Sequence, residues 1–217
     1  MYRPAHFHID DPSVIHAFIR AHPLGLLISA DDDGPLADPL PFLLDDLGNA
    51  KARLRGHMAR ANPHWRVLEK MGRALVVFQA AGHYISPGWY PSKAETGKVV
   101  PTWNYVNVQV RGPVQVHNDA DWLRQQVQDL TAVHEGASAA PWRIEDAPED
   151  FIAAQLRAII GFEIEIEAMD GKFKLSQNRS QPDRNAVVRA LDGAGAGKSD
   201  GKSADLAALM RSLGIGD

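Results

Sequence analysis

Two segments in which apolar and polar side chains alternate restrict the fold of this chain more than any other feature. Apolar residues occupy almost every second position of residues 105–118, and again of residues 161–169. Successive side chains of a strand point to opposite faces, so each segment predicts a strand with one packed and one wet face. A bend is expected in the first segment near Gly112 and Pro113. No strand–helix–strand periodicity favours a parallel sheet.

The rest of the pattern predicts further strands with helices around them. Prolines 35, 39 and 41 remove donors from a ladder, so part of that extended segment is expected at a sheet edge or beside a ligand. The elements together predict an α+β protein that is mainly β, a six-stranded antiparallel barrel with peripheral helices. Further extended segments are expected at residues 24–30, 35–46, 50–58, 73–80 and 171–178, of which, with the two above, six or so form the barrel. Helices are expected at residues 10–22, 62–71, 119–133, 148–159, 183–191 and 204–213.

Composition narrows the class of protein. The chain has 217 residues, a formal net charge of −4 and no cysteine. We expect one main domain over residues 1–191, then a flexible linker and a short helix in residues 192–217. The lack of cysteine excludes disulfides and thiol chemistry and suits a cytoplasmic protein. Neither a signal peptide nor a membrane-spanning run is expected, and the net charge gives no attraction to nucleic acid.

The octet GKFKLSQN carries two lysines and three small polar residues on one expected strand. Lys172 and Lys174 alternate with apolar residues and therefore share one face if the strand is regular. Ser176, Gln177 and Asn178 follow directly. A solvated edge strand protected by lysines is one interpretation. A site for an anionic, planar ligand is the other.

Two further segments carry groups that suit such a ligand. Arg55 and His57 alternate on one strand, and Arg60 follows just before a helix that begins near Asn62. Cations beside a helix N-terminus favour phosphate, although a basic solvated edge explains them too. The segment 103–107 places aromatic rings beside amides, which suits stacking on a flat heteroaromatic ring. A core aromatic cluster is the alternative for that segment.

Other motifs predict no site. The segment GAGAGKSDGKS lacks the spacing of a phosphate-binding loop. His6, His8 and Asp10 could share a face, but surface histidines explain them better than a metal centre, and we expect no metal. No Ser-His-Asp pairing is readable, and Ser86 lies in a Pro-Gly turn and not in a nucleophile elbow.

Several segments, taken in order, resemble the PaiB-type family of flavin mononucleotide (FMN)-binding proteins, which are described as negative transcriptional regulators. The resemblance covers Met1 to about Leu191 and is most specific at VPTWNY and GKFKLSQN. The other segments that carry it are MYRPAHF, RLRGHMARANPHW, YISPGWYPSK, LTAVHEG and IIGFEIEIEAMDGKFKLSQNRSQPDR.

The resemblance implies a split barrel that works as a homodimer, with FMN in two clefts at the interface. It places the phosphate at GHMARANP, and it implies that the segment 103–112 reaches the flavin from the partner subunit. Either lysine of the octet would meet the phosphate or the N1–C2 edge of the flavin, and Gln177 or Asn178 would bind ring edges. The residues implied to bind FMN are Arg55, His57, Arg60, Trp103, Asn104, Tyr105, Lys172, Lys174, Gln177 and Asn178.

Two functions of different classes follow from the resemblance. The first is a flavin-binding regulator that lowers expression of protease and sporulation-type genes. DNA is a partner by that description, but the negative charge does not support it. The second is an FMN-dependent oxidoreductase of the flavin-reductase or pyridoxamine-phosphate-oxidase-like class, with His57 and His83 as candidate acid–base groups. A haem-handling protein with a histidine ligand is a third interpretation.

Overall fold

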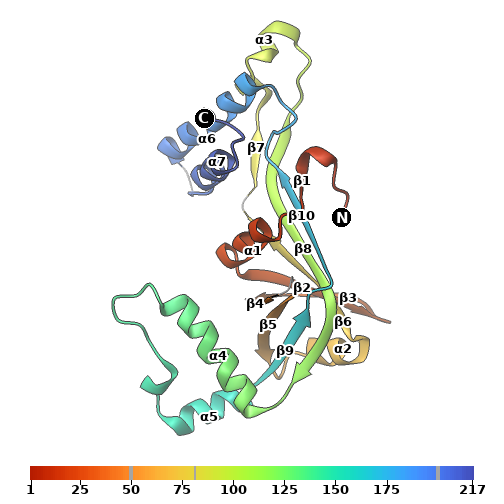
Figure 1. Ribbon diagram of the computed structural model, residues 1–217, viewed down its shortest axis with the longest axis vertical. Coiled ribbons are helices and arrows are strands. Elements are labelled where there is room, and N and C mark those ends of the chain that lie inside the picture. Colours follow the sequence, from red (N-terminus) through yellow and green to blue (C-terminus); the bar gives the residue numbers. More distant parts are fainter. Residues whose placement is uncertain (49–50, 81, 199–200) are drawn as a thin grey trace. The chain divides into compact units, whose positions relative to one another are not determined.

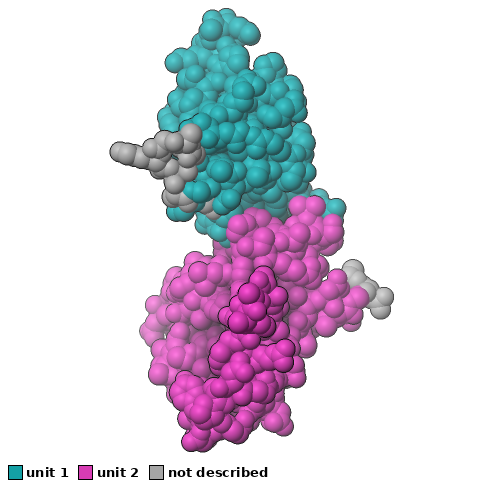
Figure 2. Space-filling model, turned by 90° about the vertical axis from the view of Figure 1, so that its left-hand side faces the viewer, with its two compact units in different colours: residues 1–11, 79–108, 170–217 teal, residues 12–78, 109–169 magenta. Residues whose placement is uncertain are grey.

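A computed structural model of the chain describes residues 1–48, 51–80, 82–198 and 201–217. The chain divides into two compact units, which Figure 2 distinguishes by colour. Unit 1 comprises Met1–Asp11, Gln79–Val108 and Asp170–Asp217, and unit 2 comprises Pro12–Phe78 and Gln109–Met169. Each unit is therefore assembled from segments that lie far apart in the sequence.

Unit 2 is built on an antiparallel sheet (Figure 1). The strand order is β3-β2-β6-β8-β9-β5-β4. Strand β2 pairs antiparallel with β3 and β6, and β9 pairs antiparallel with β5 and β8. The strands are β2 (Leu24–Asp31), β3 (Gly34–Pro41), β4 (Leu43–Gly48), β5 (Lys51–Ala59), β6 (Arg73–Gln79), β9 (Ile159–Glu165) and the later part of β8 (Thr102–His117).

The helices of unit 2 pack around this sheet because each presents an apolar stripe. They are α1 (Pro12–Ala21), α2 (His64–Met71), α4 (Ala120–Glu135), α5 (Glu149–Arg157) and the 3-10 turn η3 (Ile144–Asp146). The ring of Phe42 meets Phe78 and Phe162 edge to face, at centroid distances of 5.6 and 5.8 Å. All three rings are buried, and burial of each contributes roughly 1.5–3 kcal/mol.

Unit 1 contains strands paired in the order β1-β10-β8-β7. The register places His8 opposite Lys172 and His83 opposite Asn104. Helices α6 and α7 contact each other, and both carry buried apolar residues. The elements are β1 (His8–Ile9), β7 (His83–Ile85), β10 (Ala168–Lys174), the early part of β8, the turns η1 (Ala5–Phe7) and η2 (Pro87–Trp89), and the helices α3 (Ser92–Thr96), α6 (Gln181–Lys198) and α7 (Lys202–Ser212).

The structure confirms an α+β protein with a large antiparallel sheet. Strand β3, which carries the three prolines, ends the strand order of unit 2 and pairs with β2 along its length, as expected for a sheet edge. The predicted number of six strands was too low. The extended segment 35–46 is divided at the buried Phe42 into β3 and β4, and the short strands β1 and β7 gave no alternating pattern.

The C-terminal segment is more helical than expected. Helix α6 extends to Lys198, beyond the expected end at Leu191 and into residues that we expected to be a linker. Helix α7 begins at Lys202, and the linker residues 199–200 lie outside the described part of the chain. Helices α6 and α7 contact each other, and Leu206 and Met210 of α7 are buried. Tertiary packing of this kind outweighs the low helix propensity of glycine.

A hydrogen-bonded Ser-His-Asp array, which the sequence did not reveal, joins α2 to strands β2 and β3. The His64 Nε2 atom lies 2.7 Å from the Ser29 hydroxyl, and its Nδ1 lies 2.6 Å from an Asp38 carboxylate oxygen. Burial raises the pKa of Asp38, but hydrogen bonds from His64 and Asn62 outweigh that effect and lower it. His64 is 1% exposed and Ser29 is 6% exposed, whereas the Asp38 side chain keeps 33% of its surface in solvent. The imidazole is therefore enclosed between its two partners, and we assign the array a structural role.

We expect His64→Phe to lower the free energy of unfolding by roughly 2–3 kcal/mol, because it leaves the Ser29 hydroxyl and the Asp38 carboxylate without their shared partner. Ser29→Ala is the control, since it removes one bond and costs about 1 kcal/mol. Urea denaturation measures both. A midpoint of His64→Phe equal to that of the wild type would contradict a structural role.

Candidate functional site

The motifs VPTWNY and GKFKLSQN, which predicted the site most specifically, lie on paired strands of unit 1. The first begins the β8 strand, the second ends the β10 strand, and these strands are neighbours in the sheet. The Lys174 ammonium donates to the Trp103 carbonyl oxygen at 2.8 Å and to the Thr102 hydroxyl. The structure therefore brings the two segments side by side, and their joint role in binding FMN stays a prediction.

Tyr105 lies beside both lysines, which share a face as expected. Its ring centroid is 5.4 Å from the Lys172 ammonium and 5.9 Å from the Lys174 ammonium. The Lys172 ammonium also lies 5.6 Å from the ring of Tyr2, so two aromatic rings flank it. Cation–π contacts of this kind orient a lysine without neutralising its charge.

A small cavity of about 220 Å³ opens beside Lys174 and separates the roles of the two lysines. Lys174 lines it, whereas Lys172 is not among its lining residues. Arg179 supplies a second cation and lies over the ring of Tyr90 at 4.7 Å from its centroid. The described residues that line the cavity include no carboxylate: they are Tyr90, Val100, Pro101, Thr102, Asn104, Lys174, Ser176, Asn178 and Arg179.

The electrostatics of this cavity favour an anion. Burial lowers the pKa of Lys174, and the nearby charges of Lys172 and Arg179 lower it further, against an opposing effect of Tyr105. Cations that depress one another's pKa are relieved when an anion binds between them. Arg179 was missed as a site residue because it follows the strand, where no periodicity assigns a direction to its side chain.

The polar residues of the octet have different environments. The Gln177 side chain bonds to its own turn, accepting from the Leu175 N–H at 2.7 Å and donating to the Phe173 carbonyl at 2.5 Å. Ser176 adopts a φ of 67° and exchanges hydrogen bonds with the buried Asn104 at 3.0 and 3.2 Å. Asn178 lines the cavity. Gln177 therefore shapes the turn and does not line the cavity, whereas Asn104, Ser176 and Asn178 do line it.

Trp103 is a large aromatic side chain with half of its surface in solvent. It is 55% exposed and meets Tyr84 of β7 edge to face, at a centroid distance of 6.2 Å. His83, one of the candidate acid–base groups, lies on the same strand as Tyr84, and its Nδ1 donates to the Tyr84 carbonyl at 2.6 Å. An exposed aromatic pair of this kind fits stacking on a ligand ring better than a core cluster.

The predicted phosphate-binding residues of RLRGHMAR belong to unit 2, and their strand faces helix α4. Arg55 donates to both carboxylate oxygens of Asp45, at 2.6 and 2.9 Å, and to Asp129 of α4 at 2.8 Å. Hydrogen bonding to Asp45 raises the pKa of Arg55. The guanidinium is thus neutralised by two carboxylates, which the sequence could not show, and its role as a phosphate helper stays a prediction.

His57 also contacts α4 and borders an apolar cavity. Its Nδ1 lies 2.7 Å from Oε1 of the fully buried Gln126. Burial lowers the pKa of His57, against an opposing effect of the Gln126 bond. A neutral imidazole is a weaker ligand for phosphate than the cation that the sequence suggested, and the phosphate contact of His57 stays a prediction.

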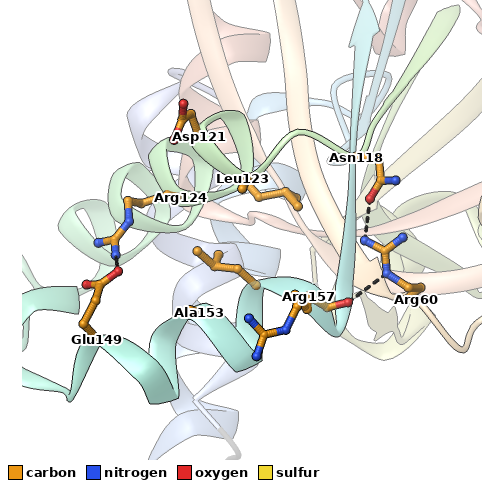
Figure 3. A pocket seen from close by; sticks show the side chains of 10 residues that line it. Arg60, Asn118, Asp121, Leu123, Arg124, Glu149, Ala153 and Arg157 are labelled. Atoms are coloured by element: carbon orange, nitrogen blue, oxygen red, sulfur yellow. Dashed lines mark hydrogen bonds and ion pairs between the residues drawn. The ribbon is translucent and has the colours of Figure 1, made fainter.

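Arg60 lies at one end of a cavity of about 620 Å³ between α4 and α5 (Figure 3). Its guanidinium donates to the carbonyls of Arg157 and Ile159, both at 2.8 Å, and to Asn118 at 2.5 Å. At the other end, Arg124 pairs with a glutamate of α5. Arg60 therefore ties the end of α5 to the start of β9, and its contact with phosphate also stays a prediction.

Comparison with known proteins identifies the family. Residues 1–168 match the family described as "Putative FMN-binding domain". The chain belongs to this FMN-binding-domain family. It is 29% identical over 191 residues to the Bacillus subtilis "Protease synthase and sporulation protein PAI 2", covering 88% of this chain and 89% of that protein. The PaiB-type resemblance is confirmed.

Two other relatives of this chain are described only as uncharacterized proteins. An uncharacterized protein of Emericella nidulans is 34% identical over 218 residues, covering 84% of this chain and 87% of the relative. An uncharacterized protein of Saccharomyces cerevisiae is 35% identical over 150 residues, covering 60% of this chain and 88% of the relative. Membership alone therefore does not decide between a regulator and an enzyme.

Solved structures share the fold of this family member. The flavocytochrome Anf3 of Azotobacter vinelandii matches with a TM-score of 0.59 at 15% identity, covering 84% of this chain and 73% of that one. The FAD and haem binding protein of Mycobacterium smegmatis matches with a TM-score of 0.56 at 18% identity, covering 77% and 73%. At these identities the likeness concerns the fold alone.

Two remaining expectations concern metals and membranes. His8 forms an ion pair with Asp10 at 2.6 Å and contacts Arg3. Within the part of the chain that the structure describes, no group of three or more histidines and carboxylates is arranged to hold a metal. Among the same residues, no helix combines the length and apolar character needed to cross a membrane.

Proposed function

We propose that this protein binds FMN and acts, in its flavin-bound form, as a PaiB-type negative regulator of gene expression. The observation that carries the FMN part is the cavity of unit 1, where two cations lie beside the family's most specific motifs. The regulatory part is supported by the relative named "Protease synthase and sporulation protein PAI 2".

The donors that line this cavity fit the phosphate of FMN. Lys174 and Arg179 supply positive charge, and Thr102 and Ser176 supply hydroxyl groups. Hydrogen bonds from cations to phosphate belong to the strong class. The cavity volume of about 220 Å³ is below the roughly 300–1,000 Å³ of sites that enclose a whole ligand. It therefore suits one end of the cofactor, while Tyr105 and Trp103 offer rings for the flavin.

A cavity of this size leaves most of an isoalloxazine to be covered by other surfaces. We propose that a second copy of the chain supplies them, in a homodimer of split-barrel subunits with FMN at the interface. The exposed pair of Tyr84 and Trp103 supports this, because large exposed aromatic side chains are enriched at interfaces. When bound, FMN supplies hydride and one-electron chemistry, and the protein holds and orients it.

The net charge of −4 gives no support to tight contact with DNA phosphates. We therefore propose that regulation acts through a partner or through a small-molecule signal sensed at the flavin. We also propose that the protein is cytoplasmic, which the lack of cysteine suits. The alternative is an FMN-dependent oxidoreductase. The two differ in whether a reduced nicotinamide turns over at the bound flavin.

The visible spectrum of the protein as purified, followed by titration with FMN, tests the proposal. We expect a flavin spectrum or saturable FMN binding with one site per chain. A colourless protein that ignores added FMN would overturn it. Anaerobic NADPH then separates the classes: rapid bleaching favours the oxidoreductase, whereas a flavin that stays oxidised favours the regulator. A salt-dependent shift of promoter DNA by the protein alone would favour a regulator that contacts DNA directly and would contradict regulation through a partner.

A further inference from the structure

A second cavity, of about 310 Å³, lies in unit 2 and is chemically unlike the first. Its walls come from β5, α4, α5, the start of β9, the turn η3 and the segment just before that turn, and apart from His57 and Gln155 they are apolar. Its volume falls at the lower end of the range of small-molecule sites. The lining residues are His57, Val127, Trp142, Ile144, Phe151, Ile152, Gln155, Leu156 and Ile159.

Two polar side chains line this cavity, the imidazole of His57 and the exposed amide of Gln155. The hydrogen bond to Gln126 sets the tautomer of the imidazole: Gln126 Oε1 accepts, so Nδ1 at 2.7 Å carries the proton and Nε2 is left as an acceptor. Within the described residues Nε2 has no hydrogen-bond partner, and it is not among the buried unpaired atoms. The imidazole thus presents an accessible acceptor of fixed tautomer in a mostly apolar wall.

The burial of Gln126 costs more free energy than is needed to hold a histidine that serves packing alone. It is fully buried, and within the described residues its Nε2 has no hydrogen-bond partner. A buried donor left unpaired costs roughly 1–3 kcal/mol, and such groups call for a functional explanation. Fixing the tautomer of His57, so that Nε2 faces a ligand as an acceptor, provides that explanation.

Two aromatic side chains of the lining remain partly in solvent. Trp142 is 44% exposed and Phe151 is 53% exposed. Below them Ile144, Ile152 and Leu156 are buried and form one apolar cluster with Leu123. A flat ring could therefore enter between exposed aromatic side chains and rest on a packed floor.

We propose that this cavity binds a small, uncharged aromatic compound with one hydroxyl or N–H group, which donates a hydrogen bond to His57 Nε2. An anion is disfavoured, because no cationic residue is among the lining residues that the structure describes. The site is separate from the proposed phosphate cavity, whose lining residues belong to unit 1.

Calorimetric titration with 2-naphthol, compared with 2-methoxynaphthalene, tests the site. The two probes share a ring system, but the ether cannot donate a hydrogen bond. We expect wild-type protein to bind one 2-naphthol per chain, about five- to tenfold more tightly than the ether. Absence of saturable 2-naphthol binding, or equal affinity for both probes, would overturn the proposal.

Two variants locate the binding. His57→Phe keeps a flat ring but removes the acceptor, so the preference for 2-naphthol over the ether should disappear. Phe151→Ser changes an exposed rim side chain with little risk to folding and should weaken both probes alike. Retained preference in His57→Phe, or unchanged affinities in Phe151→Ser, would place the probes elsewhere.

FMN titration of Phe151→Ser separates this inference from the FMN proposal. Unchanged FMN affinity, together with weakened binding of both naphthalene probes, is the expected result. Lost FMN affinity with unaltered binding of both probes would assign this cavity to FMN and refute the aromatic site. Failure of FMN to bind the wild-type protein would bear on the FMN proposal and leave the naphthol comparison intact.

Discussion

Gly112→Ala is expected to lower the free energy of unfolding by at least about 4 kcal/mol, a loss at the extreme end of single substitutions. A Cβ at this position would lie 1.7 Å from the Glu165 carbonyl oxygen and 2.9 Å from its carbon. Both are backbone atoms of the neighbouring segment, which is held in place by the hydrogen bond from the Glu167 N–H to the Arg111 carbonyl at 3.0 Å. The clash would be relieved only if the two backbone segments moved apart, since no side-chain rotation removes it.

Thermal and urea denaturation measure this effect. For a chain of this size about 4 kcal/mol corresponds to a fall in the melting temperature of roughly 8–16 °C. Gly193→Ala is the matched control, because the same methyl group is added in helix α6 where no atom lies within 4 Å. There it should stabilise the protein by roughly 0.5–1 kcal/mol. A melting temperature of Gly112→Ala close to the wild-type value would show that the strands do not approach as described.

Lys174→Met and Arg179→Gln are each expected to weaken FMN binding about ten- to hundredfold. Each removes one charge-assisted hydrogen bond to phosphate, worth roughly 1.5–3 kcal/mol, and both replacements keep most of the side-chain length. Fluorescence titration with FMN measures the affinity. Lys93→Ala is the control, since it removes the same charge from an exposed position of α3 that does not line the cavity.

The pH dependence of FMN affinity gives a second signature of Lys174. Its pKa lies below the ordinary value of 10.5, first because of burial and then because of neighbouring cations. The ammonium therefore loses its proton, and its attraction for phosphate, at a lower pH than an ordinary lysine. In the wild type, FMN affinity should fall as pH rises through the range in which Lys174 loses its proton. In Lys174→Met that part of the fall in affinity should be missing.

Unaltered FMN affinity in both Lys174→Met and Arg179→Gln would contradict the assignment of the phosphate site to unit 1. Arg60→Ala then becomes the informative variant, because the resemblance placed the phosphate there as well. Loss of affinity in Arg60→Ala alone would mean that the guanidinium leaves the carbonyls of Arg157 and Ile159, both at 2.8 Å, to meet the cofactor. The FMN proposal would survive that outcome, but its location would not.

Local pattern was sufficient for much of the fold. The alternation in residues 105–118 and 161–169 identified strands β8 and β9, and the prolines of residues 35–41 identified an edge strand. Such predictions succeed because side-chain periodicity and the missing donor of proline are properties of a few consecutive residues. The pattern failed at the two-residue strand β1 and at the extension of α6, where pairing or packing with distant residues decides the structure.

The sequence by itself determined which residue types are available to the site: two lysines on one face of strand β10, and aromatic rings on strand β8. Only the tertiary structure decided which charges remain available. It placed two carboxylates on Arg55 and a buried amide on His57, and it set Arg179 beside Lys174 in one cavity. Asp129 lies 74 residues from Arg55 along the chain, and Gln126 lies 69 residues from His57. Arg179 is near Lys174 in sequence, but it lies beyond the end of the strand, where periodicity assigns no direction. Electrostatic interaction depends on distance in space, which local periodicity does not encode.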